Sequence, residues 1–136
     1  MSRFKLAAAM AVMLSAAACS KSTVTSPTTT TAPVNVTDTF TGTLTRNGAT
    51  NFQFSVSAAG VVYATLSSVA DASTQVGLSL GTWNGISCAI VLANDLAAQG
   101  TTVTGSVTGI GTLCARVYDV GKVVDPLDYQ VTVVHP

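Results

Sequence analysis

The chain has 136 residues with six Lys or Arg, six Asp and no Glu, so its formal net charge is zero. This length is typical of a single domain. Because the chain is so poor in Lys and Arg, it has no basic patch that neutralises phosphates, and we expect no nucleic-acid partner. Only 9% of the residues are charged, so the surface must be covered mainly by Thr, Ser, Asn and Gln.

Residues 1–18 have the features of an export signal. Arg3 and Lys5 form a positively charged start, and residues 6–18 form an apolar run. A membrane-spanning helix needs about 20 apolar residues, so this run is too short to remain as a span, and no later stretch is longer. We predict that residues 1–18 are removed on export. The mature chain then has four basic residues against six Asp, a net charge of −2.

The end of this leader, Ala16-Ala17-Ala18-Cys19, resembles the signal of bacterial lipoproteins. In that family the cysteine thiol receives a diacylglycerol, the signal is cut before the cysteine, and the new amino terminus is acylated. The resemblance implies that Cys19 is lipidated with fatty acids such as palmitate. Several acyl chains on one residue hold a protein on a membrane durably. Ser20 after the cysteine resembles lipoproteins that are sent to the outer membrane.

The number of cysteines agrees with this interpretation. The chain has three, Cys19, Cys88 and Cys114, and an odd count in an exported protein leaves one thiol over. Lipidation of Cys19 leaves an even pair. The alternative is an ordinary secreted protein with a spare N-terminal cysteine, since small residues before Cys19 also satisfy ordinary signal cleavage.

Residues 19–35 are predicted to form a tether. Between residues 20 and 35 the chain has nine Ser or Thr and two Pro, and such a segment buries too little apolar surface to order itself. Flexible-chain scaling gives a mean reach of roughly 20–25 Å. The tether would separate a lipid anchor at Cys19 from a folded domain over residues 36–136.

From residue 36 the sequence alternates with a period of two. Segments rich in Val, Thr, Ile and aromatic residues are separated by Gly, Asn, Asp or Pro. No stretch keeps the 3.6-residue period of a helix over enough residues to predict one. The alternation predicts eight strands, at residues 39–45, 51–57, 61–67, 75–81, 86–92, 101–107, 112–118 and 128–134. Eight short strands at this spacing predict an all-β fold, an antiparallel β-sandwich.

Three stretches resemble the bacterial pre-peptidase C-terminal domain family. They are "GTLTRNGATNFQFSVSAAGVVYATLS", "GIGTLCARVYD" and "DYQVTVV", which lie between residues 42 and 134. Members of the family have a Gly-x-Leu turn, an alternating aromatic strand, a later Gly-Thr-aromatic-x-x-Arg-Val strand and a closing Tyr-x-Leu-x-Val strand. The resemblance implies a jelly-roll-like sandwich. It also implies an accessory role beside a secreted peptidase, or binding of collagen or polysaccharide.

The two remaining cysteines are predicted to form a disulfide, because export places them where disulfides persist. If Leu113, Ala115 and Val117 face inward, Cys114 faces outward with Arg116 and Tyr118. Cys88 also faces outward if the strands on either side of Asn84-Gly85 pair strictly and Leu78 and Leu80 are inside. The two sulfurs then meet on an outer face if their strands are neighbours. The alternative is two separate buried thiols.

Residues for catalysis are scarce. The only histidine, His135, is next to the C-terminus and is expected to be held too loosely for Ser-His-Asp catalysis. The sequence has no Cys/His cluster with zinc spacing and no Gly-rich phosphate loop before a helix. We therefore predict a protein that is not an enzyme and needs no cofactor.

Three aspartates, Asp119, Asp125 and Asp128, lie close together in the last predicted hairpin. Clustered carboxylates are typical ligands of Ca²⁺, which takes six to eight oxygens. The alternative is turn chemistry, because Asp favours turns and Asp-Pro starts them.

The one tryptophan, Trp83, precedes the hairpin signal Asn84-Gly85. A two-residue type I′ turn there would pair Trp83 with Ile86. Strict pairing places one apolar set on each face: Leu78, Leu80, Ala89 and Val91 on one, and Trp83, Ile86, Cys88 and Ile90 on the other. If the first set is inside, Trp83 and Ile86 belong to an exposed apolar stripe, and we take them with Tyr118 as candidate ligand-binding residues. If a bulge shifts the register, Trp83 is a core or edge residue.

Together these patterns predict a lipid-anchored protein of the cell envelope, most simply in the outer membrane, that displays a non-catalytic β-sandwich. Its expected role is to bind a protein or polysaccharide ligand. One alternative is a structural component of the envelope that associates with itself, since few charges keep copies apart. Another is a fragment of a secreted hydrolase, which the shortage of His and Glu disfavours.

Overall fold

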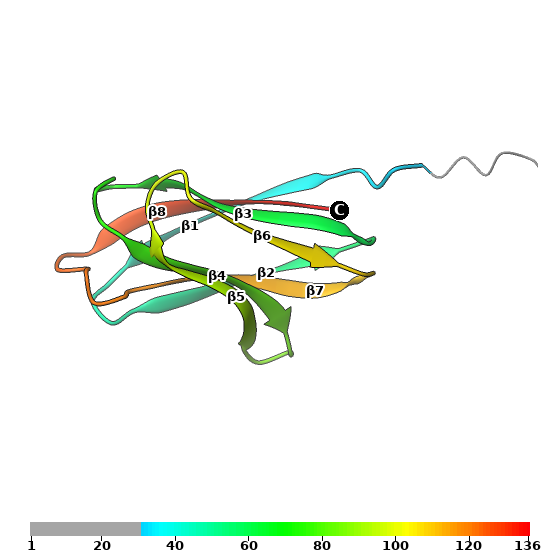
Figure 1. Cartoon of the computed structure of the whole chain (residues 1–136). Helices are drawn as coiled ribbons and strands as arrows, with labels where there is room; N and C mark the ends of the chain where they lie inside the picture. Colours follow the sequence, from blue (N-terminus) through cyan, green and yellow to red (C-terminus); the bar gives the residue numbers. More distant parts are fainter. Residues whose placement is uncertain (1–30) are drawn as a thin grey trace, which may run out of the picture. The chain divides into compact units, whose positions relative to one another are not determined.

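The computed structural model describes residues 31–136, and in this part of the chain it contains strands and no helix (Figure 1). Every predicted strand is present. The strands are β1 Val36–Leu44, β2 Ala49–Val56, β3 Gly60–Val69, β4 Val76–Trp83, β5 Cys88–Ala97, β6 Thr102–Val107, β7 Gly111–Tyr118 and β8 Leu127–His135. The fifth strand differs most from its expected range, because it begins at Cys88 and continues to Ala97.

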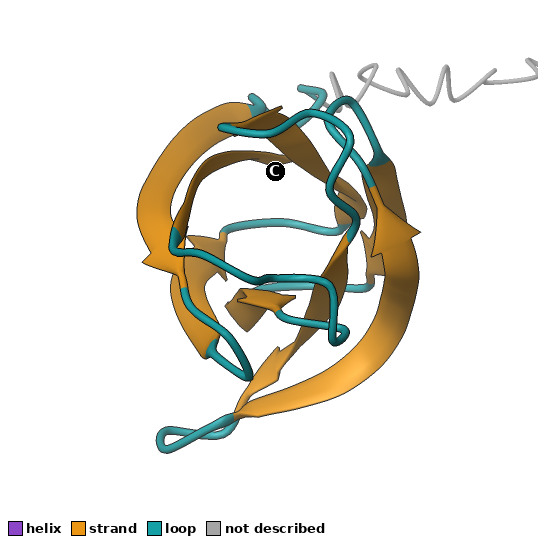
Figure 2. Cartoon of the chain, turned by 90° about the vertical axis from the view of Figure 1, so that its left-hand side faces the viewer, coloured by secondary structure: helices purple, strands orange, loops and turns teal. Residues whose placement is uncertain are grey.

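The strands form two antiparallel sheets of four, in the orders β1-β8-β3-β6 and β2-β7-β4-β5. The sheets face each other across the core (Figure 2). The predicted antiparallel β-sandwich is therefore confirmed. Consecutive strands β1 and β2 lie in different sheets, as do β5 and β6, so each flank of the sandwich is formed by two edge strands that follow one another in the chain.

Alternation fills the core from both sheets. In β2 the side chains of Phe54 and Val56 are buried, and Phe52 packs against the core, as the period of two predicts. The ring of Phe52 stacks on Phe40 with centroids 4.9 Å apart and meets Tyr129 edge-on at 6.2 Å. These aromatic contacts join β1 and β8 of one sheet to β2 of the other, so they fix how the two layers pack.

The register of the strands defines two ends of the sandwich. We call the end where β1 begins the proximal end, because Val36 pairs with His135 there. The strand pairs Gly60–Val107 and Val56–Gly111 lie at the same end. By strand direction the proximal loops are 57–59, 84–87 and 108–110, and the distal loops are 45–48, 70–75, 98–101 and 119–126. The β4–β5 loop, 84–87, bends away from the other two proximal loops (Figure 1). The chain enters the domain at the proximal end, and the C-terminus lies there too (Figure 1).

Residues 31–35 precede β1, form neither helix nor strand, and are exposed. The predicted signal, Cys19 and tether residues 19–30 lie outside the described residues. Within residues 31–136 no helix has the length and hydropathy needed to cross a membrane.

Candidate functional site

The β4–β5 hairpin closes with a loop of residues 84–87, and Trp83 pairs with Cys88. The predicted pairing of Trp83 with Ile86 is therefore wrong. A type I′ turn needs positive φ at both central residues, and in this loop only Gly85 has it, at 95°. The side chain of Asn84 instead accepts hydrogen bonds from the backbone N–H of Ile86, at 2.9 Å, and of Ser87, at 2.8 Å. This Asx-type turn lengthens the loop by two residues.

A β-bulge at Val91 changes the faces of β5. Leu80 pairs with Leu92 whereas the next residue, Gly81, pairs with Ile90, so Val91 has no partner of its own. Leu78 and Leu80 are buried as expected, but Val91 is 70% exposed. Strict pairing would place Val91 on the face of Leu78 and Leu80, but Val91 is exposed, because an extra residue in one strand breaks the strict period of two.

An exposed apolar stripe remains on this hairpin. Ile86 at the tip is 89% exposed, Ile90 is 44% exposed, and Trp83 is partly exposed. No charged residue occurs between Asp71 and Asp95. Stripes of this kind often mark binding surfaces in soluble domains.

Cys88 and Cys114 form the predicted disulfide, with their Cα atoms 5.7 Å apart. Their strands are not neighbours, since β4 lies between β5 and β7. The bridge crosses β4 at Gly81, which pairs with Cys114. A Cβ at Gly81 would lie 2.2 Å from the carbonyl oxygen of Ala89. Glycine at this position therefore lets β5 bend over β4 and brings the sulfurs together.

Tyr118 lies on the same outer face but far from Trp83. It covers Gly77, where a Cβ would lie 2.2 Å from the Tyr118 ring, and its hydroxyl donates to Asp95. Burial, followed by this hydrogen bond and the Asp95 charge, raises the pKa of Tyr118 to about 12. Gly77 and Trp83 lie six positions apart along β4, a span of about 20 Å. The structure therefore does not join Tyr118 to Trp83 and Ile86 in one site.

The carboxylate of Asp119 stabilises a turn. One of its oxygens accepts the backbone N–H of Asn47 at 2.8 Å. The other accepts three consecutive backbone N–H groups, those of Gly121, Lys122 and Val123. These hydrogen bonds, that of Asn47 first, lower the pKa of Asp119. Asp119 therefore serves the turn chemistry that was the alternative to calcium binding.

Asp128 accepts a hydrogen bond from the hydroxyl of Thr43 at 2.5 Å. Within residues 31–136, no three His, Cys, Asp or Glu side chains gather closely enough to hold a metal ion. The structure thus does not bring Asp119, Asp125 and Asp128 together as the ligands of a calcium site.

His135 is held more firmly than its place in the sequence suggests. It is buried, and its Nε2 lies 3.1 Å from the carboxylate of Asp38. Its ring packs on Phe54 with centroids 5.0 Å apart. The expectation of a loosely held histidine is wrong, because β8 extends to this residue and pairs it with β1. Its other ring nitrogen faces the backbone oxygen of Pro136 at 3.4 Å instead of a hydroxyl nucleophile.

A second surface, not predicted as a site, covers the outer face of the β1-β8-β3-β6 sheet. We call it the threonine face. Four threonines lie in register across all four strands: Thr39 pairs with Thr132, Thr132 with Thr65, and Thr65 with Thr102. The hydroxyls of Thr65 and Thr102 lie 2.8 Å apart. Along β1, Thr37, Thr41 and Thr43 continue the array and are exposed.

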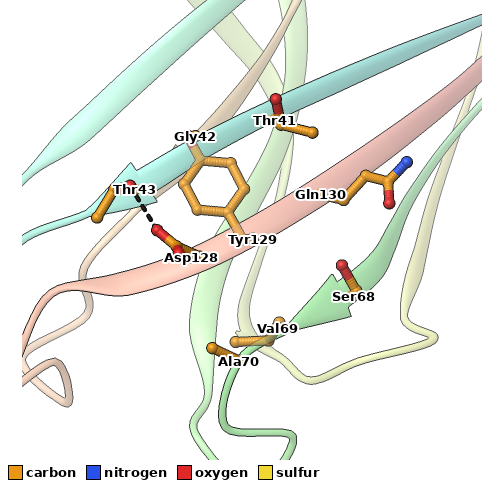
Figure 3. Close-up of a pocket in the computed structure, with 9 residues that line it drawn as sticks. All are labelled: Thr41, Gly42, Thr43, Ser68, Val69, Ala70, Asp128, Tyr129 and Gln130. Carbon is orange, nitrogen blue, oxygen red and sulfur yellow. Dashed lines mark hydrogen bonds between the residues drawn. The ribbon is translucent and has the colours of Figure 1, made fainter.

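Beside the threonine face is a hollow of about 490 Å³ (Figure 3). Its polar side chains come from β1, β3 and β8, and they are Thr41, Thr43, Ser68, Asp128 and Gln130. Figure 3 shows them around the point where Tyr129 crosses toward Gly42. The hollow therefore presents hydroxyls, one amide and one carboxylate.

The alternating Thr-x-Thr-x-Thr-x-Thr of residues 37–43 is visible in the sequence and could have indicated this surface. The row across the sheet was not predictable, because it depends on the registers of β1, β8, β3 and β6.

The fold and these two surfaces define a disulfide-bonded β-sandwich domain with one apolar hairpin and one hydroxyl-rich face. The chain matches no protein-family model and no curated protein. The resemblance to the pre-peptidase C-terminal domain family stays a prediction.

Proposed function

We propose that this chain is a lipoprotein of the bacterial cell envelope that displays a non-catalytic β-sandwich as a binding module. The observation that carries the proposal is the bond between Cys88 and Cys114. It leaves Cys19, at the end of the apolar leader, as the remaining cysteine of the three. A disulfide also agrees with an exported protein, because thiols stay reduced in the cytosol.

The threonine face supports a neutral polysaccharide as the ligand. Its hydroxyls, with the amide of Gln130, are both donors and acceptors, which suits sugar hydroxyls. Tyr63 lies on the same face, paired with Val134 and Thr104, and is 42% exposed. An exposed ring gives the apolar faces of sugars a flat surface to pack on. Asp128 is the one charged side chain among those that line the hollow, so the surface suits a ligand with little charge.

Binding of the mature protein to insoluble cell-wall polysaccharide tests this ligand. We expect Tyr63→Ala with Gln130→Ala to weaken binding at least tenfold, equivalent to about 1.4 kcal/mol. Tyr118→Phe, on the other sheet, is the control and should leave binding unchanged. Equal binding by the wild type and the double variant would exclude the threonine face as the binding surface.

Lipidation of Cys19 is tested by separation with detergent. The wild-type protein should partition into the detergent phase after export, and Cys19→Ser should partition into the aqueous phase, because acyl chains supply the membrane affinity. Wild-type protein in the aqueous phase would refute the anchor.

A structural component that associates with itself is the second candidate, and β5 favours it. This strand is an edge of its sheet, and its residues 88–94 carry no charge. Uncharged, apolar edge strands tend to pair with other chains. Assembly of the mature protein in sedimentation at modest concentration would support this candidate over a monomeric binding module.

A further inference from the structure

We propose that the proximal end of the sandwich docks on the lipid bilayer, with Ile86 and Ile110 inserted at the interface. The inference rests on the proposed lipid anchor and adds an orientation for the domain. In this orientation the threonine face stands at the side of the domain and stays open to a ligand.

Charge is distributed unequally between the two ends. The proximal loops, residues 57–59, 84–87 and 108–110, read "SAA", "NGIS" and "TGI" and contain no charged residue. The distal loops contain five charged residues, namely Arg46, Asp71, Asp119, Lys122 and Asp125. Because charged side chains resist transfer into lipid more strongly than neutral polar ones, the proximal end is better suited than the distal end to a bilayer surface.

Large apolar side chains project from these uncharged loops. Ile86 is 89% exposed and Ile110 is 82% exposed, the highest values for large apolar side chains in residues 31–136. Trp83 is partly exposed next to the loop that carries Ile86. Tryptophan is enriched at membrane interfaces, where its ring meets apolar chains and its N–H meets water. Near this end the carboxylate of Asp38 lies 3.1 Å from the ring Nε2 of His135.

The position of the tether identifies the bilayer as the occupant of this surface. Residues 19–35 connect the proposed lipid at Cys19 to β1, and β1 begins at the proximal end. The reach of roughly 20–25 Å predicted for this segment would keep that end close to the bilayer. Tethering raises the effective concentration of a linked partner to about the millimolar range, so the weak affinity of two isoleucines is sufficient for docking.

Trp83 is the only tryptophan of the chain, so its fluorescence reports on this end alone. The mature protein is placed on vesicles of phosphatidylethanolamine and phosphatidylglycerol whose acyl chains carry bromine, a quencher, near the headgroup. We expect quenching of Trp83 and protection from aqueous iodide. Ile86→Ser with Ile110→Ser should remove both effects. Val124→Ser is the matched control, since Val124 is 75% exposed in a distal loop, and it should change neither. Circular dichroism verifies that each variant is folded.

The mass of the N-terminal peptide, measured on the same sample, separates failure of the anchor from failure of docking. With Cys19 acylated, Trp83 that stays open to iodide on the vesicles overturns docking and leaves the lipoprotein intact. With Cys19 unmodified, the anchor fails, and docking then stands only if added vesicles quench Trp83 and the isoleucine variants abolish this quenching. Protection of Trp83 without vesicles that increases with protein concentration would identify a second copy as the occupant and overturn docking.

Discussion

Replacing Cys88 and Cys114 by serine is expected to lower the free energy of unfolding by about 3–4 kcal/mol. The bridge joins residues 26 apart in sequence, and without it the unfolded chain gains the entropy of that open loop. For a domain of this size, with a total stability of about 5–15 kcal/mol, the loss is a large fraction. Chemical denaturation of the wild type and the double variant measures it as a lower midpoint.

A reducing agent serves as the control for this experiment. It should destabilise the wild type and leave the double variant unchanged, because the variant has no bridge to break. Equal midpoints for the oxidised wild type and the double variant would show that the bridge contributes nothing to stability.

Gly81→Ala is expected to destabilise the domain by about 1–3 kcal/mol, the usual cost of overpacking. The new methyl group would lie 2.2 Å from the carbonyl oxygen of Ala89 and 3.0 Å from the Cα of Ile90. Both are backbone atoms of β5, so relief requires the whole strand to move away from β4. That movement also strains the bridge of Cys88 to Cys114, and thermal unfolding measures the combined effect.

Gly109→Ala is the matched control, since a Cβ at Gly109 meets no atom within 4 Å. Its melting temperature should stay close to that of the wild type. If Gly81→Ala also melts at the wild-type temperature, β5 does not lie over Gly81 as the structure shows.

The period of two in the sequence was sufficient to predict the eight strands and much of the core. Phe54 and Val56 face the core, as do Ala115 and Val117, because each lies in a strand with one buried and one outer face. The disulfide followed from the number of cysteines and from the outward direction of Cys114. The path of the disulfide across β4 could not be predicted from the sequence, because Cys88 reaches Cys114 only where β5 bends over Gly81.

The loop and register of the β4–β5 hairpin could not be predicted from the sequence pattern. Asn84-Gly85 is a strong signal for a two-residue turn, but the side chain of Asn84 caps a longer loop. The extra residue at Val91 then shifts the pairing with β4. A single inserted residue reverses the direction of the side chains that follow it, and nothing in the local composition of β5 indicates where the insertion falls. The threonine row was hidden for a related reason, since it joins residues from four distant segments.

The most direct test of the proposed function is mass spectrometry of the N-terminal peptide from the mature protein. We expect a chain that begins at Cys19, with a diacylglycerol on its sulfur and a fatty acid on its amino group. A chain that begins at any other residue, or an unmodified thiol at Cys19, would contradict the assignment as a lipoprotein.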